Sequence, residues 1–341
     1  MKGAKTNLKD AEKAKEFLIE KDALSNLHYY QKTPEYIIFP LKKKVSSKLF
    51  SIVEFDFKKK KGKPGNLKDL LKGKISQKEI EMLKRSYDTL GSIAILEIDE
   101  VFRKNEKIIA KALLDSNPNI KTVLRKDAGH EGPFRTQKMK FLAGEKTKEA
   151  VHVENGVRIR LDVEKVYFSP RLSTERKRIS ELVKKNENVL VMFSGCAPYP
   201  CVISKNTQAK EIVGIEINPA GHKYGIENVK LNKIKNVILI NGDVKDDVPA
   251  LAEKGLKFER IVMPAPHNAD SFIKEALMVA KKGTKIHFYD FLHEDDFKDA
   301  EKKVDLACKE TKRKWKKIRL VKCGQHAPRT YRVCLDFEVT N

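Results

Sequence analysis

Three short segments in the second half of the chain carry residue types that bind adenosine nucleotides. Gly195 lies in the segment FSGCAPYPC, Glu216 in GIEINP and Asp243 in NGDV. Glycine lets the backbone approach a ligand closely, the first acid is placed to accept hydrogen bonds from ribose hydroxyls, and the second can meet an adenine edge. Either acid alone is more typical of an ordinary surface carboxylate. Together, the three residues favour a site for an adenosine-containing cofactor.

Each of these segments directly follows an apolar run that we expect to be a buried strand. The alternation of apolar runs and helical stretches predicts a parallel sheet with crossover helices, whose ligand-binding edge is formed by the carboxyl ends of the strands. After a helix expected at 294–313, two strands follow at 317–322 and 330–339, which predicts a terminal antiparallel pair. The five apolar runs lie at 189–193, 212–217, 237–240, 260–263 and 284–289.

Residues 76–170, upstream of this α/β domain, have the pattern of a smaller α+β domain. A two-residue turn at Asn155 and Gly156 joins two alternating stretches, as in a β-hairpin. The expected elements are strands at 91–98 and 121–126, a helix at 102–114, and a hairpin of 150–155 with 157–168.

The chain is strongly basic, with 70 Lys and Arg against 47 Asp and Glu and a net charge of +23. Hydrophobic residues make up 40% of it, so we expect a folded protein with a polyanionic partner. Residues 1–75 alone hold nineteen Lys and nine acids. A helix at 9–24, strands at 36–41 and 49–57 and a linker at 58–65 predict a small α+β module there. Its lysines form either a solvated surface or a surface that binds phosphates.

Membrane-embedded and disulfide-stapled classes are excluded by the composition. No run reaches the ~18 consecutive apolar residues of a membrane span, and the first ten residues lack the apolar core of a signal peptide. Five cysteines with irregular spacing predict no disulfide framework, and Cys196 and Cys201 lack the partners of a zinc site. We therefore expect a soluble cytoplasmic protein without a metal.

Longer motifs resemble the archaeal and eukaryotic tRNA (guanine-37-N1)-methyltransferases over about residues 86–341. The resemblance implies a class I methyltransferase domain at 171–341, with a Rossmann-like doubly wound sheet, S-adenosylmethionine as the cofactor and tRNA as the partner. It also suggests that 76–170 contributes to tRNA binding and that 1–75 is a tRNA-docking module. The motifs are GPFRTQKMKFLAGE, VYFSPRLSTER, MFSG, GIEINP, IVMPAPHNADSFIKEAL and HAPRTYRVCLDFEV.

Methylation of guanine at N1 needs a base for the N1 proton and a cation for the charge that develops at O6. By resemblance, Glu175 in STER matches the family's general base, and Arg135 in GPFRTQ matches the arginine that faces O6. From spacing alone, Glu175 is more simply a carboxylate in the first turn of a helix, and Arg135 a loop arginine on a phosphate. The motif context favours the catalytic roles.

The resemblance also implies further contacts. Tyr167 in VYFSP matches an aromatic residue near the methyl donor, and Glu216 matches the acid on the ribose. Pro266 matches the last residue of a family Asn-Leu-Pro motif that also contacts the cofactor. Arg171 in FSPR and Asn218 in EINP fit the pattern and are assigned to substrate binding. Without the resemblance, Tyr167 would be a core aromatic and the proline a turn former.

Three positions depart from the family pattern. Val191 stands where an acid is usual, Ala197 replaces the second glycine of the MFSG loop, and Pro264 replaces an asparagine. One lost polar contact of ~1 kcal/mol and a β-carbon near the ligand predict weaker cofactor binding, by one or two powers of ten, with activity retained.

Two other functions stay open. An aminocarboxypropyl transferase of the wyosine pathway uses a related scaffold and the same cofactor, but such relatives usually lack the FRT and FSPR motifs present here. A non-catalytic tRNA-binding protein with a decayed cofactor site would account for the three departures, but it would need neither Arg135 nor Glu175. We expect the methyltransferase, as a monomer without an obligate protein partner.

Overall fold

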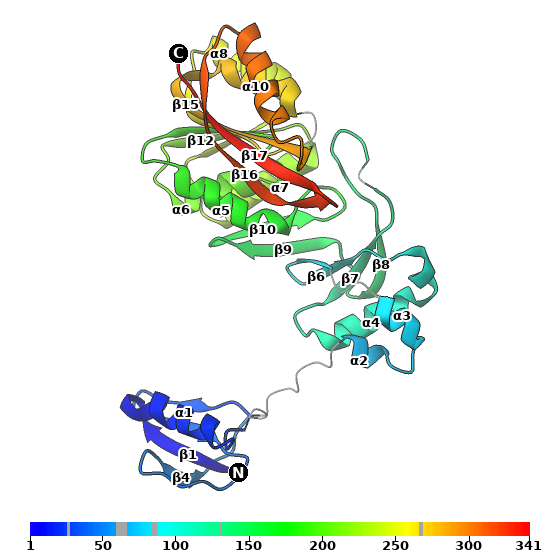
Figure 1. Ribbon diagram of the computed structural model, residues 1–341, viewed down its shortest axis with the longest axis vertical. Helices are drawn as coiled ribbons and strands as arrows, with labels where there is room; N and C mark the ends of the chain where they lie inside the picture. Colours follow the sequence, from blue (N-terminus) through cyan, green and yellow to red (C-terminus); the bar gives the residue numbers. More distant parts are fainter. Residues whose placement is uncertain (26–27, 59–66, 83–86, 130, 266–268) are drawn as a thin grey trace. The chain divides into compact units, whose positions relative to one another are not determined.

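The computed structural model describes residues 1–25, 28–58, 67–82, 87–129, 131–265 and 269–341 (Figure 1). The chain forms two compact units, residues 1–82 with 111–118, and residues 83–110 with 119–341. Within the described residues, no helix has both the length and the apolar character needed to cross a membrane. The linker expected at 58–65 lies outside the described residues, apart from Lys58.

The first unit contains a four-stranded antiparallel sheet in the order β2–β3–β1–β4. Ala14 and Leu18 of one helix pack on Ile37 and Phe39 of this sheet. The helix and two of the strands were predicted, but β1 was not, because KGAKTN has no apolar run. The elements are β1 (Lys2–Asn7), α1 (Ala11–Glu20), β2 (Gln31–Lys32), β3 (Tyr36–Pro40) and β4 (Ser51–Glu54), followed by α2 (Leu67–Leu71) and α3 (Gln77–Met82).

A smaller sheet and a hairpin begin the second unit. The hairpin turns at Asn155 and Gly156 with φ of 43° and 78°, as the sequence predicted. Its second strand ends at Asp162, so the predicted continuation to Phe168 is wrong; Val166 N–H turns back to the Asp162 carbonyl instead. The sheet has the order β5 (Asp88–Leu90), β6 (Ile93–Leu96), β7 (Thr122–Lys126), β8 (Met139–Gly144), and the hairpin is β9 (Glu149–Glu154) with β10 (Val157–Asp162). Helix α4 (Glu106–Ser116) spans the boundary of the two units.

A seven-stranded sheet in the order β13–β12–β11–β14–β15–β17–β16 dominates the second unit. Its first five strands are parallel and its last two are antiparallel, which confirms the predicted doubly wound sheet with a terminal antiparallel pair. The strands are β11 (Asn188–Met192), β12 (Glu211–Glu216), β13 (Val237–Asn241), β14 (Phe258–Met263), β15 (Ala280–His293), β16 (Trp315–Ala327) and β17 (Thr330–Val339).

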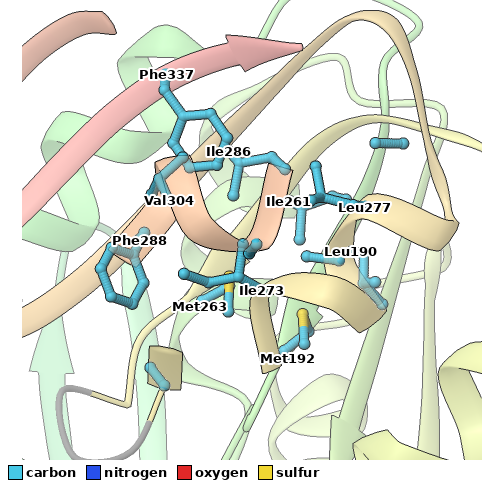
Figure 2. Packing of buried hydrophobic residues seen from close by; sticks show 14 of the residues in the cluster. Leu190, Met192, Ile261, Met263, Ile273, Leu277, Ile286, Phe288, Val304 and Phe337 are labelled. Carbon is cyan, nitrogen blue, oxygen red and sulfur yellow. The ribbon is translucent and has the colours of Figure 1, made fainter. Parts of the chain in front are cut away.

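Helices cover both faces of this sheet, because alternate side chains of each strand point to opposite sides. Leu190 and Met192 of β11 belong to the cluster formed with α8, α9 and α10 (Figure 2). Val189 and Val191 belong to the cluster with α5 and α6. The helices are α5 (Ser173–Leu182), α6 (Pro198–Asn206), α7 (Pro219–Leu231), α8 (Val244–Glu253), α9 (Ile273–Met278) and α10 (Asp299–Glu310).

Two predicted boundaries at the end of the chain are corrected. Strand β15 is longer than the expected 284–289, and the helix expected from Glu294 begins at Asp299. The extension carries Phe291 past the end of the parallel strands, where β17 still pairs with it. This extra length places side chains of β15 in the site described below.

A buried ion pair joins the hairpin to helix α5. The Arg176 guanidinium donates through Nε and Nη2 to both carboxylate oxygens of Glu154 and also donates to the Ser169 carbonyl. Both side chains are almost fully buried. Burial alone would raise the pKa of Glu154, but hydrogen bonds from His152 and Arg176 hold it below its ordinary value of 4.5.

We predict that Glu154→Ala lowers the free energy of unfolding by about 3–5 kcal/mol, because it leaves the Arg176 guanidinium buried without its charge partner. Urea denaturation at pH 7 measures this. Since the pKa of Glu154 is lowered by folding, the stabilisation is present above pH 4.5 and is lost as the pH falls through the folded-state pKa. The control is Arg160→Ala, whose half-exposed pair with Glu149 contributes at most about 1 kcal/mol. Equal effects of the two variants would contradict the prediction.

Candidate active site

A cavity of about 810 Å³ lies in the second unit, lined by the smaller sheet, the segment after β10 and the ends of β15, β16 and β17. Six cationic and three acidic side chains line it, together with Tyr167, Phe168, Phe291 and His326. Aromatic faces stack on nucleobases, and a surplus of cations attracts phosphates. The cationic residues are Arg103, Arg125, Lys126, Arg135, Arg171 and Arg332.

Arg135 and Tyr167 come together in this cavity, although 32 positions of sequence separate them. The guanidinium of Arg135 lies over the Tyr167 ring, 5.1 Å from its centroid. The Tyr167 hydroxyl accepts a hydrogen bond of 3.1 Å from Nη2 of Arg332. Burial lowers the pKa of Arg135, and the positive charge of Arg332 acts in the same direction. A partly buried guanidinium is stabilised by a hydrogen bond to a partly negative oxygen.

Sequence reasoning missed three residues of the cavity wall. Phe291 stacks on His326 with ring centroids 4.0 Å apart, and the Arg332 guanidinium lies 5.0 Å from the Phe291 ring. Phe291 and Arg332 are direct partners in the pairing of β15 with β17. The strand alternation of TYRVCLDFEV was the one available signal, but it does not reveal that β15 extends far enough to face Arg332. Burial lowers the pKa of His326, and the charges of Arg332 and Arg135 add to this, which favours a neutral imidazole.

Two of the strand-end residues that were predicted to bind a cofactor, Gly195 after β11 and Glu216 at the end of β12, are joined by a hydrogen bond. The Glu216 carboxylate accepts a hydrogen bond of 2.6 Å from the Gly195 N–H and one of 2.8 Å from the Asn218 N–H. A β-carbon on Gly195 would lie 3.8 Å from the Tyr167 carbonyl oxygen, so this loop adjoins the cavity. Exposed Ile217 offers an apolar side chain beside the acid. An acid, a close backbone and an apolar neighbour fit an adenosine moiety.

Asn218 and Asp243 both begin helices. Asn218 caps α7 by accepting from the Ala220 N–H, and its amide also donates to the Lys165 carbonyl at 2.8 Å. Asp243 caps α8 by accepting from the Lys245 N–H. Asn218 is buried, so its amide orders the loop. Pro266, the remaining predicted cofactor contact, lies outside the described residues.

Glu175 and Arg171 occupy different positions relative to the cavity. Arg171 lines it, is 67% exposed and donates to the Asp88 carboxylate at 2.8 Å. Glu175 is buried on α5 and is not among the described residues that line the cavity. Burial raises the pKa of the Cys323 thiol and the nearby Glu175 carboxylate adds to this, and Cys323 does line the cavity. Glu175 is therefore buried behind the cavity wall, near Cys323.

Two of the three departures from the family pattern lie in the core. Val191 belongs to the apolar cluster with Tyr199 and Tyr289, and Ala197 to the one with Cys201 and Tyr224; both are fully buried. The β-carbon of Ala197, which we expected to crowd the cofactor, is thus directed into the protein. The backbone of Ala197 is left-handed, with φ of 62°.

Within the described residues, one cluster has the residue types of a metal site. His287, Cys334 and Asp336 place their ligand atoms within 4.8 Å of one another, all buried. Arg178 and Arg319 already bind the Asp336 carboxylate, and Nε2 of His287 faces Arg260. Three guanidinium groups around the cluster disfavour a further cation.

The comparisons with known proteins agree on one family. Residues 150–316 match the TRM5/TYW2 methyltransferase domain, and residues 67–147 match the TYW2 N-terminal domain. A tRNA (guanine(37)-N(1))-methyltransferase of Pyrococcus abyssi, Trm5b, is 34% identical over 339 residues, with 98% of each chain covered. Its crystal structure covers 100% of both chains with a TM-score of 0.74 and 32% identity.

Two further solved structures are similar to this chain over their whole length. A complex of aTrm5 with tRNALeu has a TM-score of 0.71 and 31% identity, with 99% of each chain covered. The Trm5 of Methanocaldococcus jannaschii in complex with adenosine has a TM-score of 0.67 and 29% identity, with 100% of each chain covered.

We predict that Asn218→Ala lowers the free energy of unfolding by about 2 kcal/mol, about 1 from the lost helix cap and about 1 from the lost hydrogen bond to Lys165. Asn218→Asp keeps the acceptor that caps α7 but loses the donor, so a smaller loss is expected. Thermal unfolding of both variants measures the difference. An unchanged melting temperature in Asn218→Ala would show that the amide does not order this loop.

Proposed function

This chain belongs to the TRM5/TYW2 methyltransferase family, and we propose that it transfers a methyl group from S-adenosylmethionine to N1 of guanosine 37 in tRNA. The observation that carries the proposal is the cationic, aromatic cavity in which Arg135 lies over Tyr167 beside the loop of Gly195. A guanine extruded from its stack can be held there by its base edge. The names of the similar proteins support the same reaction and substrate.

Gly195, Glu216 and Asp243, which lie at the ends of three parallel strands, would hold the cofactor. Glu216 keeps lone pairs for ribose hydroxyls besides the two that accept N–H groups, and Gly195 brings the backbone close to the ligand. The proposed contact of Asp243 is with the adenine edge. When bound, S-adenosylmethionine supplies a methyl group on a positively charged sulfur.

Arg135 and Glu175 divide the chemistry at the guanine. Arg135 donates to O6 and stabilises the negative charge that develops there as N1 loses its proton. Glu175 accepts the N1 proton, which frees the N1 electron pair for the new bond to the methyl carbon, and the electron pair of the broken carbon–sulfur bond would stay on the cofactor's sulfur. The Tyr167 ring packs against the Arg135 guanidinium and orients it. Arg171 contributes a cation for the substrate at the rim of the cavity. The proposed approach of the guanine edge to Glu175 is past Cys323, which lines the cavity and lies near the carboxylate.

We predict that Arg135→Ala and Glu175→Gln each slow single-turnover methylation by about 10²–10⁴-fold. The first variant removes the cation that faces O6, and the second removes the base that accepts the N1 proton. Rapid-quench assays with labelled S-adenosylmethionine and a tRNA transcript measure the rate. Arg103→Ala is the matched control, since Arg103 lines the same cavity but is exposed and pairs within its own helical turn. A wild-type rate in either test variant would overturn that residue's role.

The same assay separates the alternatives. Tritium from the methyl group enters tRNA only in a methyltransferase, label from the carboxypropyl chain only in the wyosine-pathway transferase, and neither label in a non-catalytic binder. Transcripts with adenosine in place of guanosine 37 should accept no label. Methylation of such a transcript would contradict the proposed position.

The proposal includes three functional domains with boundaries near residues 75 and 170. Residues 1–75 dock the tRNA, 76–170 contribute to binding and to the active site, and 171–341 hold the cofactor. The exposed lysines of the first unit, such as Lys43, Lys44 and Lys48, support a phosphate-binding role. The enzyme would act as a monomer in the cytoplasm, where its five free cysteines stay reduced.

We predict that replacing Lys43, Lys44 and Lys48 together by Gln weakens tRNA binding by about tenfold and lowers the slope of log affinity against log salt by up to about 3. The single-turnover rate at saturating tRNA should stay unchanged, because the module docks the substrate without touching the base. Replacement of the same residues by Arg is the charge-matched control. A full loss of rate at saturating tRNA would refute the division between docking and chemistry.

A further inference from the structure

The proposed base, Glu175, is held by an arginine one turn further along the same helix. Arg178 donates from Nε to Oε2 at 2.7 Å and from Nη2 to Oε1 at 2.6 Å. Tyr289 also donates its hydroxyl to Oε1. The Glu175 side chain is 5% exposed and that of Arg178 is 17% exposed. A carboxylate so far from water stays ionised only if a cation or several donors face it.

The second edge of the same guanidinium is anchored to the sheet. Arg178 donates from Nη1 to the Asp336 carboxylate at 2.6 Å. Asp336 lies on β17 and also binds Nδ1 of His287 at 2.6 Å and Nε of Arg319 at 2.8 Å. Burial alone would raise the pKa of Asp336, but the contacts with His287 and Arg178 hold it far below its ordinary value. Arg178 is therefore fixed between an anion on each side.

His287 completes this anchor as a neutral ring. Its Nε2 lies 2.8 Å from Nη1 of Arg260, which can only donate, so Nε2 accepts and the proton sits on Nδ1. Nδ1 then donates to Asp336. Burial lowers the pKa of His287, and Arg260 is itself paired with Glu187. The neutral His287 ring and the ionised Asp336 carboxylate therefore keep their charges near neutral pH.

We propose that Arg178 is the positioning residue of the base: it places a cation against both oxygens of the Glu175 carboxylate and fixes the orientation of that carboxylate, an inference that rests on the proposed function. The Glu175 carboxylate lies near enough to Cys323 to help raise the pKa of its thiol, after burial, and Cys323 lines the cavity, so we place the arriving guanine N1–H on this side. Because Arg178 holds both carboxylate oxygens, the carboxylate cannot rotate away from that side.

The other titratable groups around Glu175 do not change their charge in the range of the test. They come from every element packed on this part of α5, namely Tyr199 on α6, Tyr289 on β15, Cys323 on β16 and Cys334 on β17. Burial raises the pKa of each of these hydroxyl and thiol groups. A shift in the acidic limb of the rate profile on changing Arg178 therefore reports the carboxylate itself.

The test is the single-turnover methylation rate of the full chain between pH 5.5 and 9, with Arg178→Met in the wild-type and Glu175→Gln backgrounds. Without the cation, a buried carboxylate takes up a proton at higher pH. We expect at least a tenfold loss of rate at pH 6.5, a smaller loss at pH 8.5, and substantial recovery in Arg178→Lys. In the Glu175→Gln background, Arg178→Met should change the rate by less than about twofold, because the two residues act as one unit.

Arg319→Met is the matched control. It removes the other arginine from the Asp336 carboxylate but leaves the pair of Glu175 and Arg178 in place. Its rate profile should keep the shape and position of the wild type. Thermal unfolding of each variant checks the fold, and Arg178→Gln, which also removes the cation, serves as the test variant if Arg178→Met does not fold.

An equal loss of rate at every pH, or an equal loss in the Glu175→Gln background, would overturn the positioning role and leave Arg178 as a structural residue. The proposed function fails in a different way, since wild-type protein would then give no methylated tRNA. A fully active Glu175→Gln would remove the base, and with it this inference, while methylation itself remained.

Discussion

Two buried charges and one mostly buried charge on helix α5 determine how the second unit is assembled. Glu175, Arg176 and Arg178 are close in sequence, and each is largely withdrawn from water and needs a partner of opposite charge or a donor. Arg176 finds its partner on the hairpin, Arg178 on β17, and Glu175 accepts from β15 as well as from Arg178. A helix tied in these three directions cannot shift relative to the sheet without breaking a buried pair. The proposed base is therefore positioned by the same contacts that hold the domain together.

The cavity wall and the buried network behind it differ in net charge. The cavity wall carries a surplus of cations, so it attracts the phosphates of a nucleic acid and stabilises negative charge on a base. The network behind it is balanced, with the carboxylates of Glu175, Asp336 and Glu187 against three guanidinium groups. Because the charges of the network cancel one another, the Glu175 carboxylate can lie near the cavity without neutralising the positive potential of the cavity wall. Cys323 lies at the boundary of the two regions.

The large sheet could be predicted from the sequence because its strands are buried on both faces and therefore consist of continuous apolar runs. The same reasoning fails for β1, whose residues KGAKTN alternate without an apolar run, and for the length of β15. The run of apolar residues in β15 ends where the parallel neighbours end, while its pairing with β17 continues to His293. Pairing partners outside the local sequence decide such boundaries.

The site was predictable to a similar degree. The strand-end acid and glycine follow from the edge rule of parallel sheets, and the structure links Glu216 to Gly195 by a hydrogen bond. The candidate roles of Arg135 and Tyr167 came only from the family motifs, and their contact with each other was not predicted, because neither residue lies in a pattern that local spacing explains. Arg178 gave no signal, since in STERKRISEL it has the same character as any exposed helical arginine. Its role depends on β17, which is more than 150 positions away.

From the sequence, the departures at Val191, Ala197 and Pro264 predict weaker cofactor binding and motivate the alternative of a decayed site, and the burial of the first two weakens that alternative. Val191 and Ala197 are fully buried in apolar clusters on α5, α6 and α7, so their side chains support the helices. A carboxylate at position 191 would lie in the cluster of Tyr199 and Tyr289 and would need its own partner there. A valine packs in this cluster without burying a charge. Of the three substituted residues, only Pro264 is partly exposed at the ligand edge, and one changed contact weakens binding without abolishing the chemistry.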